Sequence, residues 1–420
     1  MREMKDSGIE WVGKIPHCWN TSKLKYLGQY INGYAFKPEE WGTKGVPIIR
    51  IQDLTGSNDN PNYFEGQIDK KYGVENGDIL ISWAATLDAF IWNKGNGWLN
   101  QHIFKAVPNR KIIDYDYFFW MIKESMKNMN NDNKHGIFMQ HVTLSVFNNF
   151  TIPMPPLAEQ HRIAAFLDRK CAEIDAVLEK TRASIEEYKK LKQAVITQAV
   201  TKGVRGDRPM KDSGIEWIGD IPAEWSVVRI KNLFDYRNER NFRPLDEVNL
   251  ISLYTDKGVV QHCDLEETTG NKASNADGYK LVYENDIVVN IILCWMGAIG
   301  RSAYCGVTSP AYDVYSPKQG INSKFYHYLF RTNGFSGDCY KVGRGIMAMR
   351  WRTYSDQFRA IKVVFPSQSE QEEIIKYLDE KCAGIDALIT KKQQYLTEIE
   401  NYKKSLIYEY VTGKKEVHPL

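Results

Sequence analysis

The chain has 420 residues, enough for two or three domains, and its 25% charged and 43% hydrophobic residues are ordinary for a water-soluble globular protein. Its net charge of +3 means that any nucleic-acid surface must be local, and no apolar run approaches the roughly 20 residues that cross a bilayer. Seven cysteines without a C-x-x-C pair argue against a disulfide framework or a zinc site, and the N-terminal segment lacks the apolar core of a signal peptide, so a reducing, cytoplasmic setting is expected.

A tryptophan-rich leader occurs twice. Residues 4–19 and 210–225 are identical at 12 of 16 positions, so the chain is a tandem duplication. In the first copy, Trp11, Ile15, Pro16 and Trp19 favour an apolar clip over a ligand pocket, because aromatic residues at this density usually become buried.

A globular insert follows each leader, at about 20–152 and 226–365, and the two inserts resemble each other far less than their surroundings do. Both have the short strand and helix patterns of a mixed α/β domain. The first has strand-like runs at 46–51 and 77–82 and a helical pattern at 116–126; the second has strand-like runs at 249–253, 285–290 and 361–365 and a helical pattern at 324–331. The turn and strand at 77–80 and 285–288 correspond to each other.

Residues 157–200 form a long helix, because they contain no Gly or Pro and follow the breaker run 153–156. A continuous helix of that length would extend about 66 Å at 1.5 Å per residue, too long for the core of one domain. Small or apolar residues recur in alternating steps of three and four, interrupted by Thr181 and Lys192, which is a heptad seam. Its main positions are Leu167, Cys171, Ile174, Leu178 and Ile185.

The partner of this helix lies in the same chain. Adding 211 to each seam position gives a second seam of the same register, and even the polar interruptions coincide, Thr181 with Lys392 and Lys192 with Lys403. We therefore expect the helices to form an intramolecular antiparallel coiled coil; the alternative is that each helix packs on its own domain. The second seam includes Leu378, Cys382, Ile385, Ile389, Leu396 and Leu406.

The predicted fold is α+β, with two mixed α/β domains separated by two long helices in a pseudo-two-fold repeat. A Gly-containing polar segment, residues 201–209, links the copies. The expected boundaries are 1–152 for the N-terminal domain, 153–200 for the first spacer helix, 210–365 for the C-terminal domain, 366–412 for the second spacer helix and 413–420 for a tail.

The repeated leader G-I-E-W-[VI]-G-x-I-P and the run Pro153-Met154-Pro155-Pro156-Leu157-Ala158-Glu159-Gln160 that opens the first helix resemble the specificity subunit of type I restriction–modification enzymes. The resemblance covers nearly the whole chain, and the second helix opens on Pro366-Ser367-Gln368-Ser369-Glu370-Gln371. It implies that each insert recognises one half of a split double-stranded DNA target, that the helices hold the inserts at a fixed distance, and that they form a platform for two modification subunits.

The resemblance also implies that the catalytic chemistry belongs to partner subunits. Modification subunits would carry S-adenosylmethionine and methylate adenine, and translocating restriction subunits would use ATP and magnesium. The residues agree, because the sequence has no phosphate-binding P-loop and no dinucleotide fingerprint. The histidines are too scattered to predict a metal site, and Asn60-Pro61-Asn62-Tyr63 fits a turn better than a methyltransferase motif.

Candidate DNA contacts gather just before each long helix. One stretch, 341–352, combines glycines for close backbone approach with arginines that fit guanine edges or phosphates, and 134–141 is its counterpart. A solvated basic loop is the alternative for each. The candidates in these stretches are Lys134, His135, Gln140, Lys341, Arg344, Arg350 and Arg352. Weaker candidates, for which packing or solvation is an equal alternative, are Lys37, Arg50, Trp83, Thr86, Gln101 and His102 in the first insert and Arg237, Arg240, Arg243, Tyr254, Lys257, Asn290 and Trp295 in the second.

Three hypotheses follow. The first is a non-catalytic DNA-recognition and assembly subunit. The second is a coiled-coil adaptor between protein partners, which a salt-dependent DNA-binding assay would separate from the first. The third is a self-sufficient methyltransferase or nuclease, which a methylation assay on the purified chain would reveal.

Overall fold

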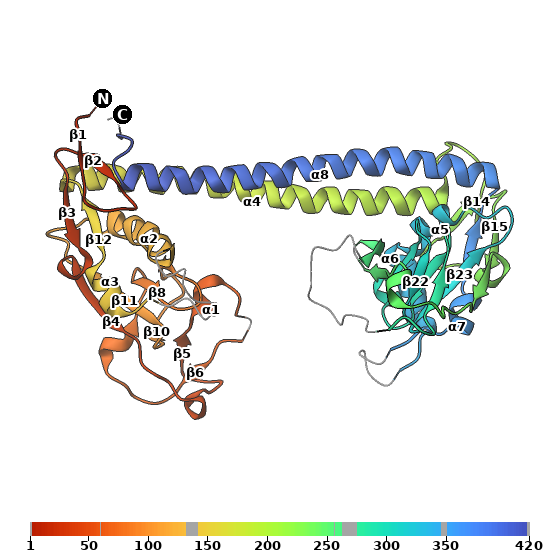
Figure 1. Cartoon of the computed structure of the whole chain (residues 1–420), viewed down its shortest axis with the longest axis horizontal. Coiled ribbons are helices and arrows are strands. Elements are labelled where there is room, and N and C mark those ends of the chain that lie inside the picture. The colour runs from red at the N-terminus through yellow and green to blue at the C-terminus, as the bar shows by residue number, and fades with distance from the viewer. Residues whose placement is uncertain are drawn as a thin grey trace. The chain divides into compact units, whose positions relative to one another are not determined.

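A computed structural model describes residues 2–58, 60–131, 142–255, 257–262, 275–345 and 351–417, with the side chains of residues 130 and 131 excepted. The chain divides into two compact units, Met1–Arg182 with Gln394–Leu420 and Ala183–Gln393 (Figure 1). Each unit contains one globular domain and one part of each long helix. None of the helices in the described ranges combines the length and apolar character that a membrane span requires.

The globular domain of the first unit contains an antiparallel sheet in the order β4-β11-β8-β9. All four residues of β8 are buried, which explains why its sequence is a continuous apolar run rather than an alternating one. The sheet strands are β4 (Gly28–Asn32), β8 (Ile79–Ser82), β9 (Asp88–Ile91) and β11 (Ile103–Pro108). A second sheet has the order β6-β5-β10-β7, with strands β5 (Val46–Ile49), β6 (Tyr63–Phe64), β7 (Gly73–Val74) and β10 (Gly97–Leu99).

One strand is shorter than predicted. The strand expected at 46–51 ends at Ile49, because Arg50 is the N-cap residue of α1 (Ile51–Thr55). The carboxylate of Asp53 accepts a hydrogen bond of 2.8 Å from the Arg50 backbone N–H and so stabilises a helix start where the strand would have continued.

The domain of the second unit repeats the first sheet with the order β16-β23-β20-β21. A left-handed residue precedes the matching strands β8 and β20, Gly77 with φ +91° and Asn285 with φ +74°, which confirms that the predicted turn is shared. The sheet strands are β16 (Phe234–Arg237), β20 (Ile287–Asn290), β21 (Ile299–Arg301) and β23 (Tyr312–Pro317). Shorter antiparallel pairs join β17 (Ile251–Tyr254) to β18 (Gly258–Gln261) and β19 (Lys280–Val282) to β22 (Gly306–Thr308).

The helices of the two domains differ. The first domain has α2 (Tyr115–Asn131) and the short α3 (Leu144–Asn149), whereas the second has α5 (Ser323–Phe330), α6 (Asn333–Val342) and α7 (Ser355–Ala360). The predicted helices at 116–126 and 324–331 are therefore α2 and α5, and α2 extends five residues beyond its predicted end.

Each leader forms a hairpin of the same register, β1 (Met4–Asp6) with β2 (Lys14–Pro16) and β13 (Met210–Asp212) with β14 (Asp220–Pro222). The next strand of each copy then pairs with the strand that precedes its long helix, so each insert begins and ends at the same place. These pairs are β3 (Asn20–Lys23) with β12 (Thr151–Met154) and β15 (Ser226–Arg229) with β24 (Lys362–Phe365).

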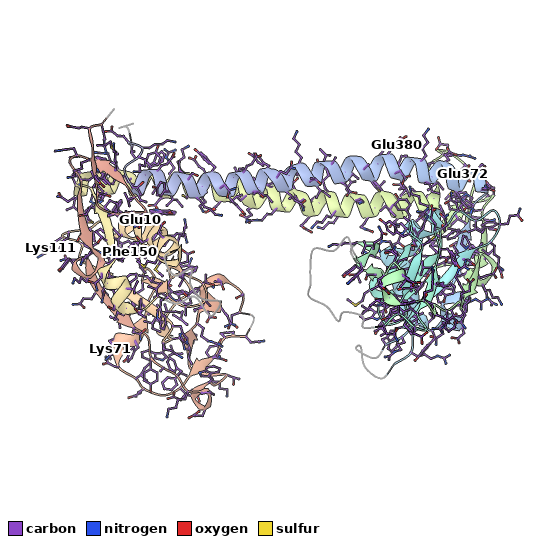
Figure 2. All side chains as sticks on the ribbon, viewed as in Figure 1. Glu10, Lys71, Lys111, Phe150, Glu372 and Glu380 are labelled. Carbon is purple, nitrogen blue, oxygen red and sulfur yellow. The ribbon has the colours of Figure 1, made fainter. Side chains whose placement is uncertain are left out.

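The long helices are α4 (Leu157–Lys202, 46 residues) and α8 (Gln368–Val411, 44 residues). They run antiparallel in each unit: Asp175 pairs with Lys403 in the first, and Lys192 pairs with Asp386 in the second. The predicted antiparallel pairing is thus confirmed. Every predicted seam position is buried or half-buried, whereas residues outside the contact, such as Glu372 and Glu380, project into solvent (Figure 2).

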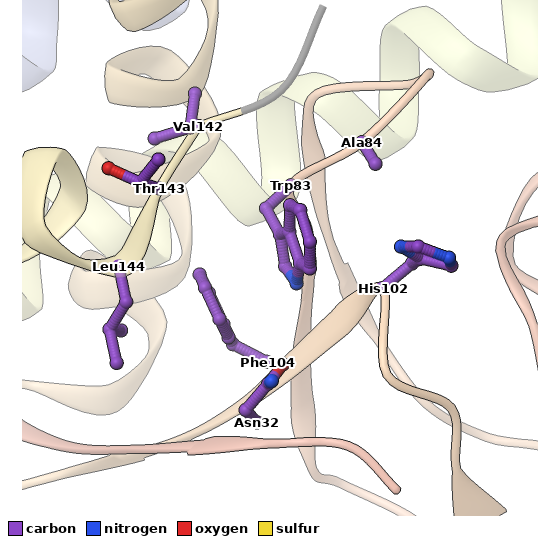
Figure 3. A pocket seen from close by; sticks show the side chains of 8 residues that line it. All are labelled: Asn32, Trp83, Ala84, His102, Phe104, Val142, Thr143 and Leu144. Carbon is purple, nitrogen blue, oxygen red and sulfur yellow. The ribbon is translucent and has the colours of Figure 1, made fainter. Parts of the chain in front are cut away.

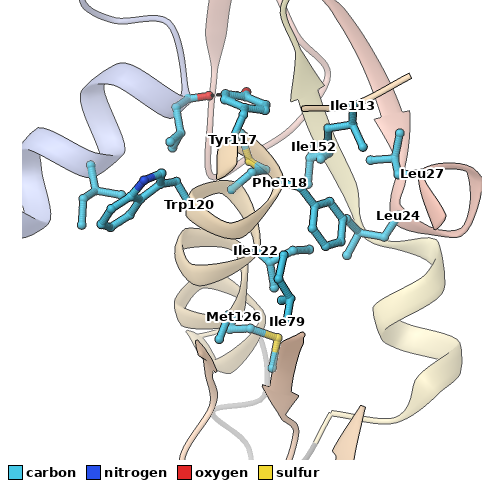
Figure 4. Packing of buried hydrophobic residues seen from close by; sticks show 14 of the residues in the cluster. Leu24, Leu27, Ile79, Ile113, Tyr117, Phe118, Trp120, Ile122, Met126 and Ile152 are labelled. Atoms are coloured by element: carbon cyan, nitrogen blue, oxygen red, sulfur yellow. Dashed lines mark hydrogen bonds between the residues drawn. The ribbon is translucent and has the colours of Figure 1, made fainter. Parts of the chain in front are cut away.

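Helix α2 joins the sheet of the first unit to its helix pair in one hydrophobic core (Figure 4). Phe118 and Ile122 lie in the same cluster as Ile79 of β8. Toward the long helices, the Trp120 indole N–H donates to Asp168 of α4 at 2.7 Å, and the Tyr117 hydroxyl donates to the carbonyl of Val411 at 3.3 Å. The globular domain and its helix pair therefore share one continuous hydrophobic core within this unit.

Candidate nucleic-acid interface

The start of each long helix is fixed by a buried glutamate. In the first unit the Trp19 indole N–H donates to Glu159 at 3.0 Å, and Arg2 forms an ion pair with the same carboxylate. The second unit repeats the arrangement: Trp225 donates to Glu370 at 2.8 Å, and Arg208 is the paired arginine. A buried carboxylate requires such partners, since charge removed from water is costly unless it is paired and hydrogen-bonded.

The glutamine that follows each glutamate ties the helix start to the globular domain. The side-chain oxygen of Gln160 accepts from the Asp114 N–H at 2.8 Å, and its amide donates to the Pro155 carbonyl at 2.8 Å. Gln371 makes the equivalent bonds to Asn322 and Pro366, both at 3.0 Å. Asp114 immediately precedes α2, and Asn322 is the N-cap of α5.

These two hydrogen-bond sets give the repeated Glu–Gln pair a positioning role that sequence reasoning missed. The identity of Glu159-Gln160 with Glu370-Gln371 was visible, but apart from the prolines five residues before each glutamine their partners are 46 to 162 residues away. A usable signal did exist, because Arg2 and Arg208 precede Trp19 and Trp225 by the same distance in both copies.

The candidate contacts of the first domain are not gathered at one point. Lys37 is exposed at the start of the loop before β5, and the Arg50 guanidinium lies over the Trp41 ring, 4.9 Å from its centroid. Gln101 has a buried side-chain oxygen without a hydrogen-bond partner in the described part of the chain. Lys134, His135 and Gln140 lie outside the described residues.

His102 lines an aromatic cavity of about 480 Å³ (Figure 3). Trp83 forms its central wall; its ring is stacked on Phe104 with centroids 5.8 Å apart, and the His102 ring lies 5.3 Å away on the other side. The remaining lining residues are Asn32, Ala84, Val142, Thr143 and Leu144. Trp83 therefore serves the packing of the domain, and one side of it remains open to this cavity.

The first described residue after 132–141 is anchored beside this cavity. The Val142 N–H donates to the Trp83 carbonyl at 2.9 Å, and Thr353, which is 211 residues further, donates to the Ile291 carbonyl at 2.9 Å. Both basic stretches predicted from the sequence thus rejoin their domains at corresponding places, just beyond β8 and β20.

Two candidates of the second domain have internal partners. Arg237 bonds to the buried carboxylate of Asp286 at 2.9 Å and pairs with Glu239 at 2.6 Å. Burial raises the pKa of the Asp286 carboxyl, and the hydrogen bond from Arg237 opposes that rise. The side chain of Asn290 accepts from the Ile292 N–H at 3.0 Å and so caps the turn after β20. Both side chains stabilise the domain, which leaves neither free for an outside ligand.

The other candidates of this domain are nearer the surface. Arg240 bonds to the Gly278 carbonyl at 3.0 Å, Lys257 lies over the Tyr254 ring at 5.9 Å, and Lys341 pairs with exposed Glu216 at 2.9 Å. Arg243 is exposed. Arg344 and Arg352 are joined through their backbones, with N–O distances of 2.8 and 3.0 Å, and Arg350 lies outside the described residues.

Metal or nucleophilic chemistry has no evident centre in the described ranges. They contain no group of three or more His, Cys, Asp or Glu residues that could hold a metal ion. The described cysteines are free, and Cys171 and Cys382 are buried at matching seam positions. What the described residues offer is arginine, lysine and aromatic side chains on two related domains, which suits nucleic-acid contact.

A family model and two relatives of known type assign this chain to the same protein family. The family described as "Type I restriction modification DNA specificity domain" matches residues 16–187 and 222–398, one match for each copy. The EcoBI specificity subunit of Escherichia coli is 24% identical over 98% of this chain and 90% of its own length. The MjaVIII specificity subunit of Methanocaldococcus jannaschii is 27% identical over 97% of this chain and 95% of its own. Both are called type I restriction enzyme specificity subunits.

Solved structures share the fold at low sequence identity. A chain described under "Structural basis underlying complex assembly and conformational transition of the type I R-M system" has a TM-score of 0.70, with 13% identity over 96% of this chain and 99% of its own. The HsdS subunit from Thermoanaerobacter tengcongensis has a TM-score of 0.51, with 14% identity over 96% of this chain and 98% of its own.

These comparisons give no support to the adaptor or to the self-sufficient enzyme. Both copies of the repeat match the specificity family separately, and the two relatives match over 97 to 98% of this chain and 90 to 95% of their own length. The chain belongs to the type I restriction–modification DNA-specificity family, whose members recognise DNA and leave catalysis to other subunits.

Proposed function

We propose that this chain is the specificity subunit of a type I restriction–modification complex in which each globular domain recognises one half of a split DNA target. The observation that carries the proposal is the repeated frame around two unlike inserts. The junctions at Glu159 and Glu370 are equivalent bond for bond, whereas the inserts differ in their helices and in their basic residues. Such an arrangement keeps two attachment points constant and varies what each domain can contact.

Affinity for DNA would come from local basic groups. The inserts are nearly neutral: residues 20–156 contain 14 basic and 13 acidic residues, and residues 226–365 contain 18 and 14. Phosphate contacts supply sequence-independent binding even from a few lysines and arginines on one face, and base-edge contacts add the specificity.

The helix pair would bind two modification subunits at equivalent positions. Val177 and Tyr402 in the first unit, and Leu191 and Leu388 in the second, are 40 to 57% exposed. Each directly precedes a seam residue, so all four have the same heptad position, a flank that faces its counterpart in an antiparallel pair. Adding 211 converts Val177 into Leu388 and Leu191 into Tyr402.

The opposite flank is charged. In the first unit Arg182 bonds to Glu400 at 2.6 Å, and Asp175 of the Asp175–Lys403 pair has the same heptad position as these two residues. In the second unit Asp386 of the Lys192–Asp386 pair has that position. One flank of the helix pair is thus polar and satisfied, whereas the other offers two related apolar patches. Two copies of one partner, each with an apolar surface, fit this pattern.

The chemistry would reside in the partners. Modification subunits would bind S-adenosylmethionine and methylate adenine within the recognised site, and restriction subunits would use ATP and magnesium to translocate and cut. The complex would act in the cytoplasm.

The test is methylome mapping with the chain co-expressed with the modification subunit of its source. A bipartite methylated sequence is expected, and exchanging the residues between Asn20 and Met154 for the insert of another family member should alter only one half. A matched insertion of four residues in both long helices should change the gap while leaving both halves intact. Methylation by the purified chain alone, or an exchange that alters both halves, would contradict the proposal.

A further inference from the structure

The guanidinium group of Arg50 lies over the ring of Trp41. Its guanidinium carbon lies 4.9 Å from the ring centroid, and the indole is 40% exposed. We propose that Arg50, oriented by Trp41, recognises the edge of a guanine in the half-site bound by the N-terminal domain. The inference rests on the proposed function and names a specificity-determining residue for it.

The backbone of Arg50 is fixed. It follows β5, which is paired in parallel with β10 through Ile48–Trp98 and Ile49–Leu99. Its N–H donates to one oxygen of Asp53 at 2.8 Å, and the other oxygen of Asp53 accepts from the Asn58 amide at 2.6 Å. The nearest acid in sequence is therefore occupied by other donors, and the structure records no carboxylate on the Arg50 guanidinium in the described residues.

Arg50 differs in this respect from three arginines of the second domain. Arg237 is bound to Asp286 and Glu239, Arg240 to Gly278, and Arg301 to Asn285 at 2.6 and 2.9 Å. The guanidinium donors of those three side chains bond to other groups of the domain. Within the described residues no acceptor is recorded for the guanidinium donors of Arg50, while the ring of Trp41 restricts the position of the group. This combination is expected of a side chain that is preorganised for an outside ligand.

The chemistry favours guanine. A guanidinium presents a planar fork of N–H donors, and stacking on an indole restrains the plane without occupying those donors. Guanine offers two adjacent acceptors, O6 and N7, in the major groove, and this pair matches the fork. A phosphate also matches it, but a phosphate contact carries no sequence preference.

The first insert provides a matched control. Its only other arginine, Arg110, also stacks on an aromatic ring, 4.9 Å from the centroid of Tyr115. Arg110 lies between β11 and α2, close in sequence to the junction residue Asp114, and so belongs to the frame rather than to the variable surface. Removing it tests whether any stacked arginine has the same effect.

The experiment uses the complete modification complex and a DNA library randomised in the N-terminal half-site. The wild type should require guanine at one position, and Arg50→Ala should reduce that preference by roughly 5- to 150-fold while leaving the C-terminal half-site unchanged. Arg50→Lys should restore only part of it, Trp41→Leu should weaken it at the same position, and Arg110→Ala should not change it.

Three outcomes would overturn the inference: an unchanged motif in Arg50→Ala, equal loss of binding to all sequences, or relaxation in Arg110→Ala instead. Duplexes with 7-deazaguanine at that position remove the N7 acceptor and should weaken the wild-type complex but not Arg50→Ala. Retained recognition of the C-terminal half-site shows that the variants fold. Failure of the wild-type complex to methylate a split site would instead refute the proposed function.

Discussion

Asp175 of α4 and Lys403 of α8 form an ion pair at 2.6 Å, and Asp386 and Lys192, each displaced by 211 residues, form the same pair at 2.6 Å with the roles of the helices exchanged. The lysines are seam residues, with 22 and 28% of their side chains exposed, and the aspartates are more than half exposed. A lysine that interrupts an apolar seam fixes the register only if its partner stands opposite it, and here both do.

We expect the coupling energy of Asp175 with Lys403 to be small. The aspartate is 57% exposed, so solvent screens the pair, and a double-mutant cycle with Asp175→Asn and Lys403→Met should give about 0.2–1 kcal/mol. Replacing Lys192 and Lys403 together by leucine should keep or raise the unfolding temperature, because apolar seam residues pack better than charged ones.

The same double replacement should reduce pairing specificity. Without the two lysines, shifted or intermolecular pairings no longer bury an unpaired charge, so light scattering should detect dimers or larger species at high protein concentration. If the variant remains as monomeric as the wild type by light scattering, the lysines do not select the register.

Loss of the glutamate at a helix junction should be costly. Glu370 is nearly fully buried and accepts from both Trp225 and Arg208. Glu370→Gln therefore leaves Arg208, itself only 10% exposed, with the half-exposed Glu224 as its remaining carboxylate partner. We expect a loss of about 3–5 kcal/mol in the free energy of unfolding, measured with denaturant.

Two further variants give a scale for this loss of unfolding free energy. Trp225→Phe keeps the ion pair and removes one hydrogen bond, so it should cost about 1–3 kcal/mol. Glu173→Gln removes an exposed pair with Arg169 on the same class of helix and should stay within about 0.5 kcal/mol. Equal effects for the buried and the exposed glutamate would refute the positioning role.

Acid should weaken the second unit through His327. Burial, together with the nearby Arg331 and Arg301, lowers the pKa of His327 from 6.5 to about 3, and its Nδ1 accepts from the Arg301 N–H at 3.1 Å. The folded state therefore keeps the ring neutral, whereas the unfolded chain takes up a proton below about pH 6.5. The stability that this difference contributes is complete above that pH and is lost as pH falls toward 3.

His327→Gln keeps an acceptor and removes the titration. Its free energy of unfolding should depend less on pH between 6.5 and 4 than that of the wild type, as thermal denaturation at a series of pH values would measure. His17→Gln, which changes an exposed histidine, should leave the dependence unaltered. Parallel curves for wild type and His327→Gln would exclude His327 as the cause.

The periodic parts of the fold were predictable, because periodicity is a local property of the chain. The heptad seam gave the antiparallel helix pair, and the repeated leader gave two hairpins of one register. The strand at 46–51 was predicted too long because the cap made by Asp53 depends on one hydrogen bond that apolar spacing does not encode.

The candidate contacts were less predictable, since a basic residue has the same letter whether it serves the fold or a ligand. Arg237 looked available in sequence but is bound to Asp286, 49 residues away, while Arg50 is held by Trp41, only nine residues before it. Whether the guanidinium of an arginine pairs with a carboxylate or stacks on an indole depends on which side chains the strands place beside it.

The exposed apolar flank predicts how the complex assembles. Val177→Asp with Tyr402→Asp places two charges on the patch of the first unit, and Leu191→Asp with Leu388→Asp does so in the second. Since all four side chains are 40 to 57% exposed, the free chain should lose little stability, whereas an apolar partner surface would have to bury unpaired carboxylates. Each double variant should therefore bind one modification subunit instead of two, and the quadruple variant none, as mass photometry would count.

Arg182→Ala with Glu400→Ala, on the charged flank, should still bind two. If the patch variants retained two subunits and the charged-flank variant lost them, the binding surface would lie on the side of Arg182 and Glu400, because only that flank would then respond to substitution.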